Sequence, residues 1–207
     1  MLRRTPIVRQ MADALAIAAS YTQEDKNDEI ERVYFVRFSD FTQLSSAPHV
    51  EEHEQWEYRL FENDKPIGTL RSRSIDQGDS YELTIKTYRK GDVGSMECNL
   101  AGTQDMHETV AALADRVLRK IRYVYRVPVT HNGVELDLKW EIDVFKLPDG
   151  SFYPWVKVDL EVPDPAVQAP AFPFQYEEII DASYDRTLTA DEKRTIDALF
   201  VAVKADH

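Results

Sequence analysis

The chain has 207 residues, 43% of them hydrophobic, which is enough for one domain with its own core. Its net charge of −12 excludes general, non-specific binding to nucleic acid or to an anionic membrane, so a site for a polyanion must be local. A single cysteine, Cys98, excludes an intrachain disulfide framework and a cysteine-based metal cluster, and fits a reducing, cytoplasmic compartment.

Residues 1–24 are expected to form an amphipathic helical extension of a main domain at residues 25–207. Thr5 can cap this helix, and Pro6 suits its first position. The apolar stripe of the helix comprises Ile7, Met11, Leu15 and Ala18. The stripe could cover the main domain or dock on a second copy of the chain, so a homodimer is compatible with the sequence. No apolar run is long enough to span a bilayer, and no membrane partner is expected.

Alternating apolar and polar residues after the extension predict a first group of antiparallel strands. Turn-forming residues at 63–64, 77–79 and 90–92 separate them. Residues 39–54 lack a strand pattern and are expected to form a mobile loop at an entrance. The predicted strands cover residues 29–38, 56–61, 68–74, 81–88 and 95–100.

Helical spacing then replaces the strand pattern over residues 103–118, with Thr103 as the expected cap. A second strand group covers residues 120–128, 134–145 and 156–162, with turns at 131–133 and 148–150. Four prolines between positions 163 and 173 indicate an extended segment that crosses outside the ladder. Thr189 and Glu192 form the capping-box pattern of a last helix. Its expected buried stripe is Ile196, Leu199, Phe200 and Val203.

The strands VELDLKWEIDVF and VKVDLEV place every charge on one face and apolar residues on the other. Taken alone, such strands favour an ordinary solvated sheet face. If the sheet closes into a barrel, however, the charged rows could all point into its lumen. Carboxylates there would bind a hard divalent cation, and cationic side chains would hold phosphate oxygens. The rows on other strands are Glu29 and Glu31, Arg71 and Arg73, Lys86, and Lys120 with Arg122 and Arg126.

The ordered segments DEIERVYF, TLRSR, YELTIK, MEC, KIRY, WEIDVF, VDLEV and EEIIDASYDRTL resemble the triphosphate tunnel metalloenzymes, or CYTH superfamily, over residues 29–188. The resemblance implies an α+β fold, an antiparallel polar-lined β-barrel with flanking helices. It also implies a metal-dependent hydrolase of a triphosphate-containing small molecule, such as a nucleoside triphosphate, tripolyphosphate or thiamine triphosphate. Mg²⁺ or Mn²⁺ would be the cofactor, and no nucleic-acid duplex is expected as a partner.

The resemblance further implies roles for particular residues. The implied metal ligands are Glu29, Glu31, Asp159 and Glu161. The implied catalytic residues are Glu29, Glu31 and Lys86. The implied phosphate-binding residues are Arg59, Arg71, Arg73, Lys86, Lys120 and Arg122. The residues expected to line the tunnel besides these are Glu97, Lys139, Asp143 and Lys157.

Three positions depart from the family pattern. Val33 stands where the family's E-x-E-x-K opening has its lysine, and Ser95 and Asn99 stand where an R-x-E-x-E strand has arginine and its second glutamate. Arg37 shares the face of Val33 but lies about 13 Å further along the strand, which makes it a poor replacement. The departures leave the fold unaffected and put catalysis, or the usual substrate, in question.

Other functions therefore stay open. A tunnel protein could bind a nucleotide or polyphosphate without hydrolysing it, because losing groups that act mainly on the transition state costs rate more than ground-state binding. A class IV-type adenylyl cyclase would release pyrophosphate, whereas a hydrolase would release orthophosphate. A scaffold without a ligand would bind no metal. The sequence does not determine the organic moiety of the substrate or the oligomeric state.

Overall fold

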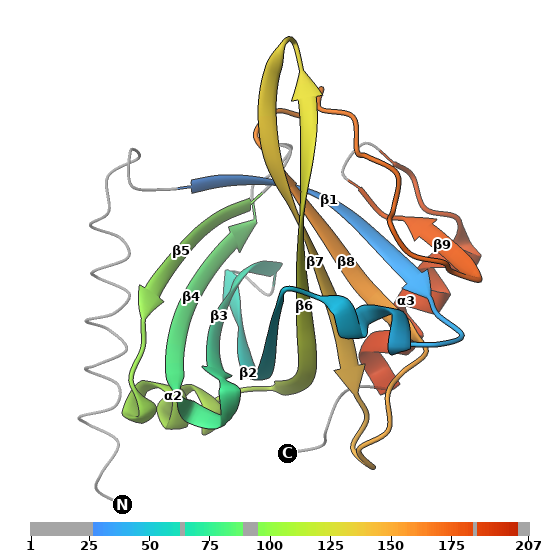
Figure 1. Ribbon diagram of the computed structural model, residues 1–207. Helices are drawn as coiled ribbons and strands as arrows, with labels where there is room; N and C mark the ends of the chain where they lie inside the picture. The colour runs from blue at the N-terminus through green and yellow to red at the C-terminus, as the bar shows by residue number, and fades with distance from the viewer. Residues whose placement is uncertain (1–26, 63–64, 89–94, 184–185, 203–207) are drawn as a thin grey trace, which may run out of the picture.

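The computed structural model describes residues 27–62, 65–88, 95–183 and 186–202 (Figure 1). The predicted N-terminal helix and the turns at 63–64 and 90–92 lie outside these residues. The described chain forms one antiparallel sheet with helices at its edges and ends. No helix in this part of the chain is long and apolar enough to cross a membrane.

The strands follow one another in the order β5-β4-β3-β2-β6-β7-β8-β1-β9 across the sheet. Their bounds are β1 Asn27–Arg37, β2 His49–Glu62, β3 Lys65–Ile75, β4 Ser80–Tyr88, β5 Ser95–Ala101, β6 Arg116–His131, β7 Val134–Lys146, β8 Trp155–Val162 and β9 Glu178–Asp181. The helices are α2 Gln104–Ala111 and α3 Ala190–Ala202, with the short 3₁₀ helices η2 Thr42–Ser46 and η3 Asp76–Gly78.

The sheet is strongly curved and meets itself at one corner (Figure 1). Besides pairing with β8 from Ile30 to Arg37, β1 pairs with β5 from Asn27 to Glu29. Among the residues that the structure describes, the contact of β1 with β5 involves only these three residues of β1. The structure therefore shows a curved antiparallel sheet that encloses a hollow, but not the fully closed barrel that the sequence predicted.

The longest hairpin, β6–β7, extends beyond the rest of the sheet (Figure 1). Its turn contains Asn132 and Gly133, with φ of 50° and 78°. Both values lie in the left-handed region that a two-residue type I′ turn requires and that Asn-Gly adopts readily. The turn therefore sets the register in which β6 and β7 face each other down to Arg119 and Lys146.

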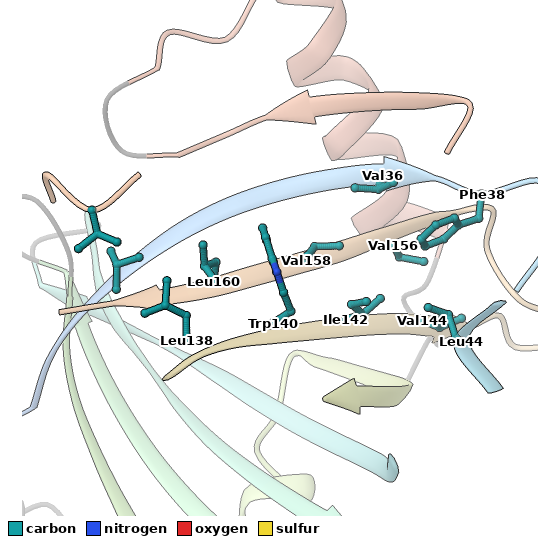
Figure 2. Close-up of a cluster of buried hydrophobic side chains, with 12 residues drawn as sticks. Val36, Phe38, Leu44, Leu138, Trp140, Ile142, Val144, Val156, Val158 and Leu160 are labelled. Carbon is teal, nitrogen blue, oxygen red and sulfur yellow. The ribbon is translucent and has the colours of Figure 1, made fainter. Parts of the chain in front are cut away.

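The main apolar core lies on the convex side of the sheet, on the outward faces of β7, β8 and β1 (Figure 2). Trp140, Val158 and Val36 are at most 2% exposed there. The proline-rich segment at residues 163–177 crosses this face without forming a helix or strand, as predicted. From it, Phe172 packs edge-on against Trp140, with ring centroids 5.5 Å apart. Because the polar residues of these strands face inward, their apolar residues face outward and must be covered by another part of the chain.

Helix α3 packs on the concave side, at the end where the inner face becomes apolar. Along β7, the inward row passes from Asp143 to Phe145, and along β8 it passes from Lys157 to Trp155. Leu199 of α3 is fully buried against these aromatic rings. The predicted capping box is confirmed, since the Thr189 N–H donates to Glu192 Oε2 at 2.7 Å and the Glu192 N–H donates to Thr189 Oγ1 at 3.3 Å. Val203 lies outside the described residues.

Two predictions of local structure were wrong in extent. The helix that begins after Thr103 ends at Ala111, because Arg116 already pairs with Glu57 of β2. The stretch expected to be a mobile loop contains η2 and the first six residues of β2, His49 to Glu54. Val50 is the only apolar residue in this part of β2, so there is no apolar alternation to detect. The short strand β9 was also not predicted.

Leu199→Ala tests whether α3 is needed for the stability of the curved sheet. Removing a fully buried leucine leaves a cavity, and we expect a loss of about 3 kcal/mol in the free energy of unfolding, measured with urea. Val201→Ala on the same helix is the control, because Val201 is 70% exposed and its truncation should change stability by less than about 0.5 kcal/mol. Equal effects of the two variants would contradict the burial of this face of α3.

Candidate functional site

The curved sheet encloses a cavity of about 430 Å³, to which the strands β1 to β8 and α3 all contribute side chains. Among the side chains that the structure describes, equal numbers of acidic and basic groups line it. The eight carboxylates are Glu31, Glu57, Glu82, Glu97, Glu141, Asp143, Asp159 and Glu161. The eight cationic groups are Arg71, Arg73, Lys86, Arg116, Lys120, Arg122, Lys139 and Lys157. The formal charges of the described lining therefore cancel.

Most of the residues predicted for the site line this cavity. Arg59 does not, because its side chain is about half exposed and forms an ion pair with Asp115 outside the cavity. Glu29 lies opposite Ser95 in the β1–β5 pairing, but its side chain lies outside the described part of the structure. The predicted residues that the structure brings together are Glu31, Arg71, Arg73, Lys86, Glu97, Lys120, Arg122, Lys139, Asp143, Lys157, Asp159 and Glu161.

Strands β3 and β6 form a basic wall of the cavity. Arg71 donates to Glu97 at 3.1 Å, Arg73 pairs with Glu82 at 3.0 Å, and Arg116 pairs with Glu57. One carboxylate thus orients each guanidinium group. The Nε atoms of all three arginines are buried without a hydrogen-bond partner, although a guanidinium offers five donors. Each of these guanidinium groups therefore has one donor that the described protein atoms do not satisfy.

Strands β1, β7 and β8 form an acidic wall. Glu31 lies directly opposite Glu161, and Asp159 lies directly opposite Glu141. Like charges in such cross-strand pairs destabilise a sheet unless a cation lies between them. Burial raises the pKa of the Asp159 carboxyl, and the nearby Glu31 and Asp143 raise it further against the opposing effect of Lys157. This wall therefore favours an added positive charge.

Two lysines of the chain supply positive charge to the acidic wall. Lys157 Nζ donates to both oxygens of Asp159, at 2.6 and 2.5 Å. Lys139 Nζ contacts Glu141 at 2.8 Å and Glu161 at 3.0 Å. At the corner where β1 meets β5, Lys86 lies 3.2 Å from Glu97 and 3.9 Å from Glu31. The two walls are thus joined by ammonium groups.

A buried ion cluster joins β6 to β7 in the lining of the cavity. Arg122 donates two hydrogen bonds to Asp143, at 2.8 and 2.9 Å, and Lys120 donates one at 2.5 Å. Burial raises the pKa of the Asp143 carboxyl, but Arg122 and Lys120 outweigh burial and hold it well below its usual range. Burial and the Arg122 charge lower the pKa of Lys120 to about 7, against the pull of Asp143.

The acidic wall has the chemistry of a divalent-cation site. Glu31, Asp159 and Glu161 offer the hard carboxylate oxygens that Mg²⁺ and Mn²⁺ prefer. Burial and the nearby Glu31 and Asp143 raise the pKa of Asp159, and a bound cation would favour its charged form. In the part of the chain that the structure describes, no three such side chains are already gathered in a metal-binding group. A cation would therefore have to replace the lysines that now hold these carboxylates.

The charged ladder of β7 divides between the cavity and solvent. Lys139, Glu141 and Asp143 line the cavity, whereas Asp137 lies on the protruding hairpin and pairs there with the exposed Arg126. The solvated face and the polar lumen considered from the sequence are thus both present on one strand. The curvature of the sheet, which no local pattern shows, decides where one changes to the other.

The structure also places residues that the sequence analysis passed over or left open. Arg116 was missed because it was expected in a helix, although its parity with Lys120 would have shown the shared face. Val33 contributes to the apolar cluster around α3. Arg37 pairs with Glu177 at 3.2 Å and does not line the cavity. Asn99 lines it and accepts a hydrogen bond from Thr84 at 2.7 Å.

No protein-family model and no curated protein matches the sequence. Similar solved structures include a proposed adenylyl cyclase from Hippeastrum, HpAC1, with a dominant triphosphatase activity. This structure has 16% sequence identity and a TM-score of 0.48, and the match covers 66% of this chain and 80% of that chain. A proposed adenylate cyclase from Bacillus halodurans has 13% identity and a TM-score of 0.42, with coverages of 68% and 83%. PH1819 from Pyrococcus horikoshii has 14% identity and a TM-score of 0.40, with coverages of 65% and 80%. These identities and TM-scores are low, so the function proposed below rests on the cavity itself.

Asp143→Ala tests the buried cluster. The variant leaves two cations buried without their shared carboxylate, so we expect the free energy of unfolding at pH 7 to fall by about 3 kcal/mol or more. Asp137→Ala is the matched control on the same strand, since its ion pair with Arg126 is largely exposed and should contribute less than about 1 kcal/mol. A loss in Asp143→Ala no larger than in the control would refute the cluster.

Lys120→Met tests the lowered pKa of Lys120. In the folded protein this pKa is about 7, below the ordinary 10.5, so the unfolded chain binds the proton more strongly. The contribution of Lys120 to stability therefore increases as pH rises from about 7 to 10.5. Urea unfolding at several pH values should show wild type gaining stability relative to Lys120→Met over this range. A difference that does not vary with pH would mean that Lys120 keeps its ordinary pKa.

Proposed function

We propose that the cavity binds a small molecule carrying a triphosphate group and hydrolyses a phosphoanhydride bond with the help of a divalent cation. The observation that carries this proposal is that a guanidinium wall and a carboxylate wall face one enclosed cavity. A polyphosphate chain complexed with a divalent cation is a ligand that needs both kinds of group at once.

The basic wall would hold the phosphate oxygens. Arg71 and Arg73 lie on neighbouring inward positions of β3, and Lys86 of β4 lies opposite Thr69 of β3. Arginine forks bind phosphate oxygens in two directions, which fixes the orientation of the chain as well as its position. In-line displacement depends on such positioning, so these side chains would align the phosphoanhydride bond with an attacking water.

The acidic wall would hold the cation. Glu31, Asp159 and Glu161 are the described candidates, and Glu29 is the candidate whose side chain lies outside the description. Bound there, Mg²⁺ or Mn²⁺ supplies neutralisation of phosphoryl charge and a more acidic bound water. Asp143 lies between the two walls, where its two bonds to Arg122 keep that guanidinium turned toward the cavity. The organic moiety of the ligand, a cytoplasmic location and pairing with a second copy stay predictions.

A second candidate function is binding without hydrolysis. The observation that favours it is the absence of a cavity-facing cation on the described part of β1, where Val33 packs with the apolar residues around α3 and Arg37 pairs with Glu177. A site with one cation fewer could still hold the ground state of a polyphosphate while accelerating its cleavage less. Cyclisation differs from both, because it would convert ATP to a cyclic product and pyrophosphate.

Phosphorus NMR of the protein with ATP, GTP and tripolyphosphate distinguishes these functions. A hydrolase should release orthophosphate with Mg²⁺ or Mn²⁺. This release should stop when a chelator is added, and it should be absent in the Glu31→Ala variant. Pyrophosphate as the product would identify the cyclase. With Mg²⁺, intact ligands with broadened lines would indicate binding without hydrolysis, and intact, unbroadened ligands would refute both proposals for these compounds.

Arg71→Ala tests the basic wall. Loss of a charge-assisted hydrogen bond should weaken the binding of tripolyphosphate, measured by titration calorimetry, by about tenfold or more. Arg59→Ala is the control, because this arginine belongs to the neighbouring strand β2 but pairs with Asp115 outside the cavity. Equal affinities of the two variants would contradict a phosphate site on β3.

A further inference from the structure

Lys157 occupies the position on the acidic wall where a cation would bind. Its Nζ donates to both carboxylate oxygens of Asp159, which is 3% exposed. The Lys157 side chain keeps 26% of its surface exposed and lines the cavity. One group thus neutralises a buried carboxylate and faces the ligand space.

No side chain that lines the cavity from the described part of the neighbouring strand β1 is cationic. Directly opposite Asp159, β1 carries Val33, and opposite Lys157 it carries Phe35. Arg37, further along, is engaged with Glu177. Lys157 is therefore the counter-ion that this part of the acidic wall depends on.

We propose that Lys157 is an exchangeable counter-ion: it neutralises Asp159 in the free protein and moves to a phosphate of the ligand when a divalent cation takes over Asp159. This inference rests on the proposed function and assigns a particular role in it to Lys157. The ligand would then gain a cation on the side of the cavity where β1 has none.

The geometry favours such an exchange at Lys157 over Lys139. Both hydrogen bonds of Lys157 go to one carboxylate, so a single substitution by a divalent cation frees the whole ammonium. Lys139 instead bridges Glu141 on its own strand and Glu161 on β8. A lysine has a flexible four-carbon stem and three donors, so it can turn from a carboxylate to a phosphate without movement of the strand.

The exchange also explains how an anion can enter a cavity whose described charges already cancel. A polyphosphate alone would have to break existing ion pairs to be bound. A polyphosphate with a divalent cation brings the replacement for each lysine that it recruits. Binding of the cation to Asp159 and binding of phosphate to Lys157 are therefore expected to favour each other.

Lys157→Met tests this role with two affinities that should change in opposite directions. Without any phosphate ligand, Mn²⁺ binding followed by electron paramagnetic resonance should become tighter, on the order of tenfold, because the ammonium no longer competes for Asp159. With Mn²⁺ present, calorimetry should show tripolyphosphate binding weakened by a similar factor. The melting temperature of the variant should also rise more on addition of Mn²⁺ than that of wild type, because the cation restores a partner to Asp159.

Lys146→Met is the matched control. Lys146 is also 26% exposed and also pairs with a glutamate, Glu52, but it does not line the cavity. It should leave both affinities and the Mn²⁺ response unchanged. If Lys157→Met does not fold even with Mn²⁺, Lys157→Gln replaces it, since glutamine keeps a donor for Asp159 without the charge.

The outcomes separate this inference from the proposed function. Wild type that binds Mn²⁺ and tripolyphosphate, with Lys157→Met behaving as Lys146→Met does, would overturn the exchange and leave the proposed function standing. Weaker Mn²⁺ binding in Lys157→Met would also overturn it. Wild type that binds neither Mn²⁺ nor tripolyphosphate would overturn the proposed function itself.

Discussion

The ion cluster in which Asp143 accepts hydrogen bonds from Arg122 and Lys120 shows the constraint on which the rest of the structure depends. Charges that a curved sheet turns inward must be paired, because burying an unpaired charge costs free energy comparable to the whole net stability of a small domain. Each inward row therefore forms ion pairs with opposite charges on a neighbouring strand. The same constraint places the apolar faces on the outside of β7, β8 and β1, where the chain must cover them (Figure 2).

That covering explains parts of the chain that do not touch the site. The proline-rich segment and η2 supply Phe172 and Leu44 to the convex core, and α2 supplies Val110 to the outer face of β3 and β4. Helix α3 does the reverse, since it packs into the concave side where the inward rows become aromatic. The cavity is therefore bounded by an apolar cluster at one end and by ion pairs along its walls.

Ion pairs that stabilise the free protein also limit what can bind. Buried pairs contribute little net stability over apolar packing, but breaking one by removing a partner is costly. A ligand for this cavity must therefore replace each partner that it displaces. A polyanion with a divalent cation satisfies this requirement, because it brings both signs of charge. The side chains that stabilise the free sheet are in this way the same ones that select the ligand.

The sequence by itself determined which side chains share a face, because the alternation of a strand is local: Glu31 with Val33, Arg71 with Arg73, and Asp159 with Glu161 could be assigned before any fold was known. It also determined the caps and turns, such as Thr189 with Glu192 and Asn132 with Gly133. Only the tertiary structure decided which face lies inside and where each row enters the cavity. Asp137 and Asp143 have the same parity on one strand, yet one is solvated and the other is buried. The pairing of Arg116 with Glu57 of β2 was equally hidden, because curvature and register depend on strands far apart in the sequence, whereas parity depends only on neighbours.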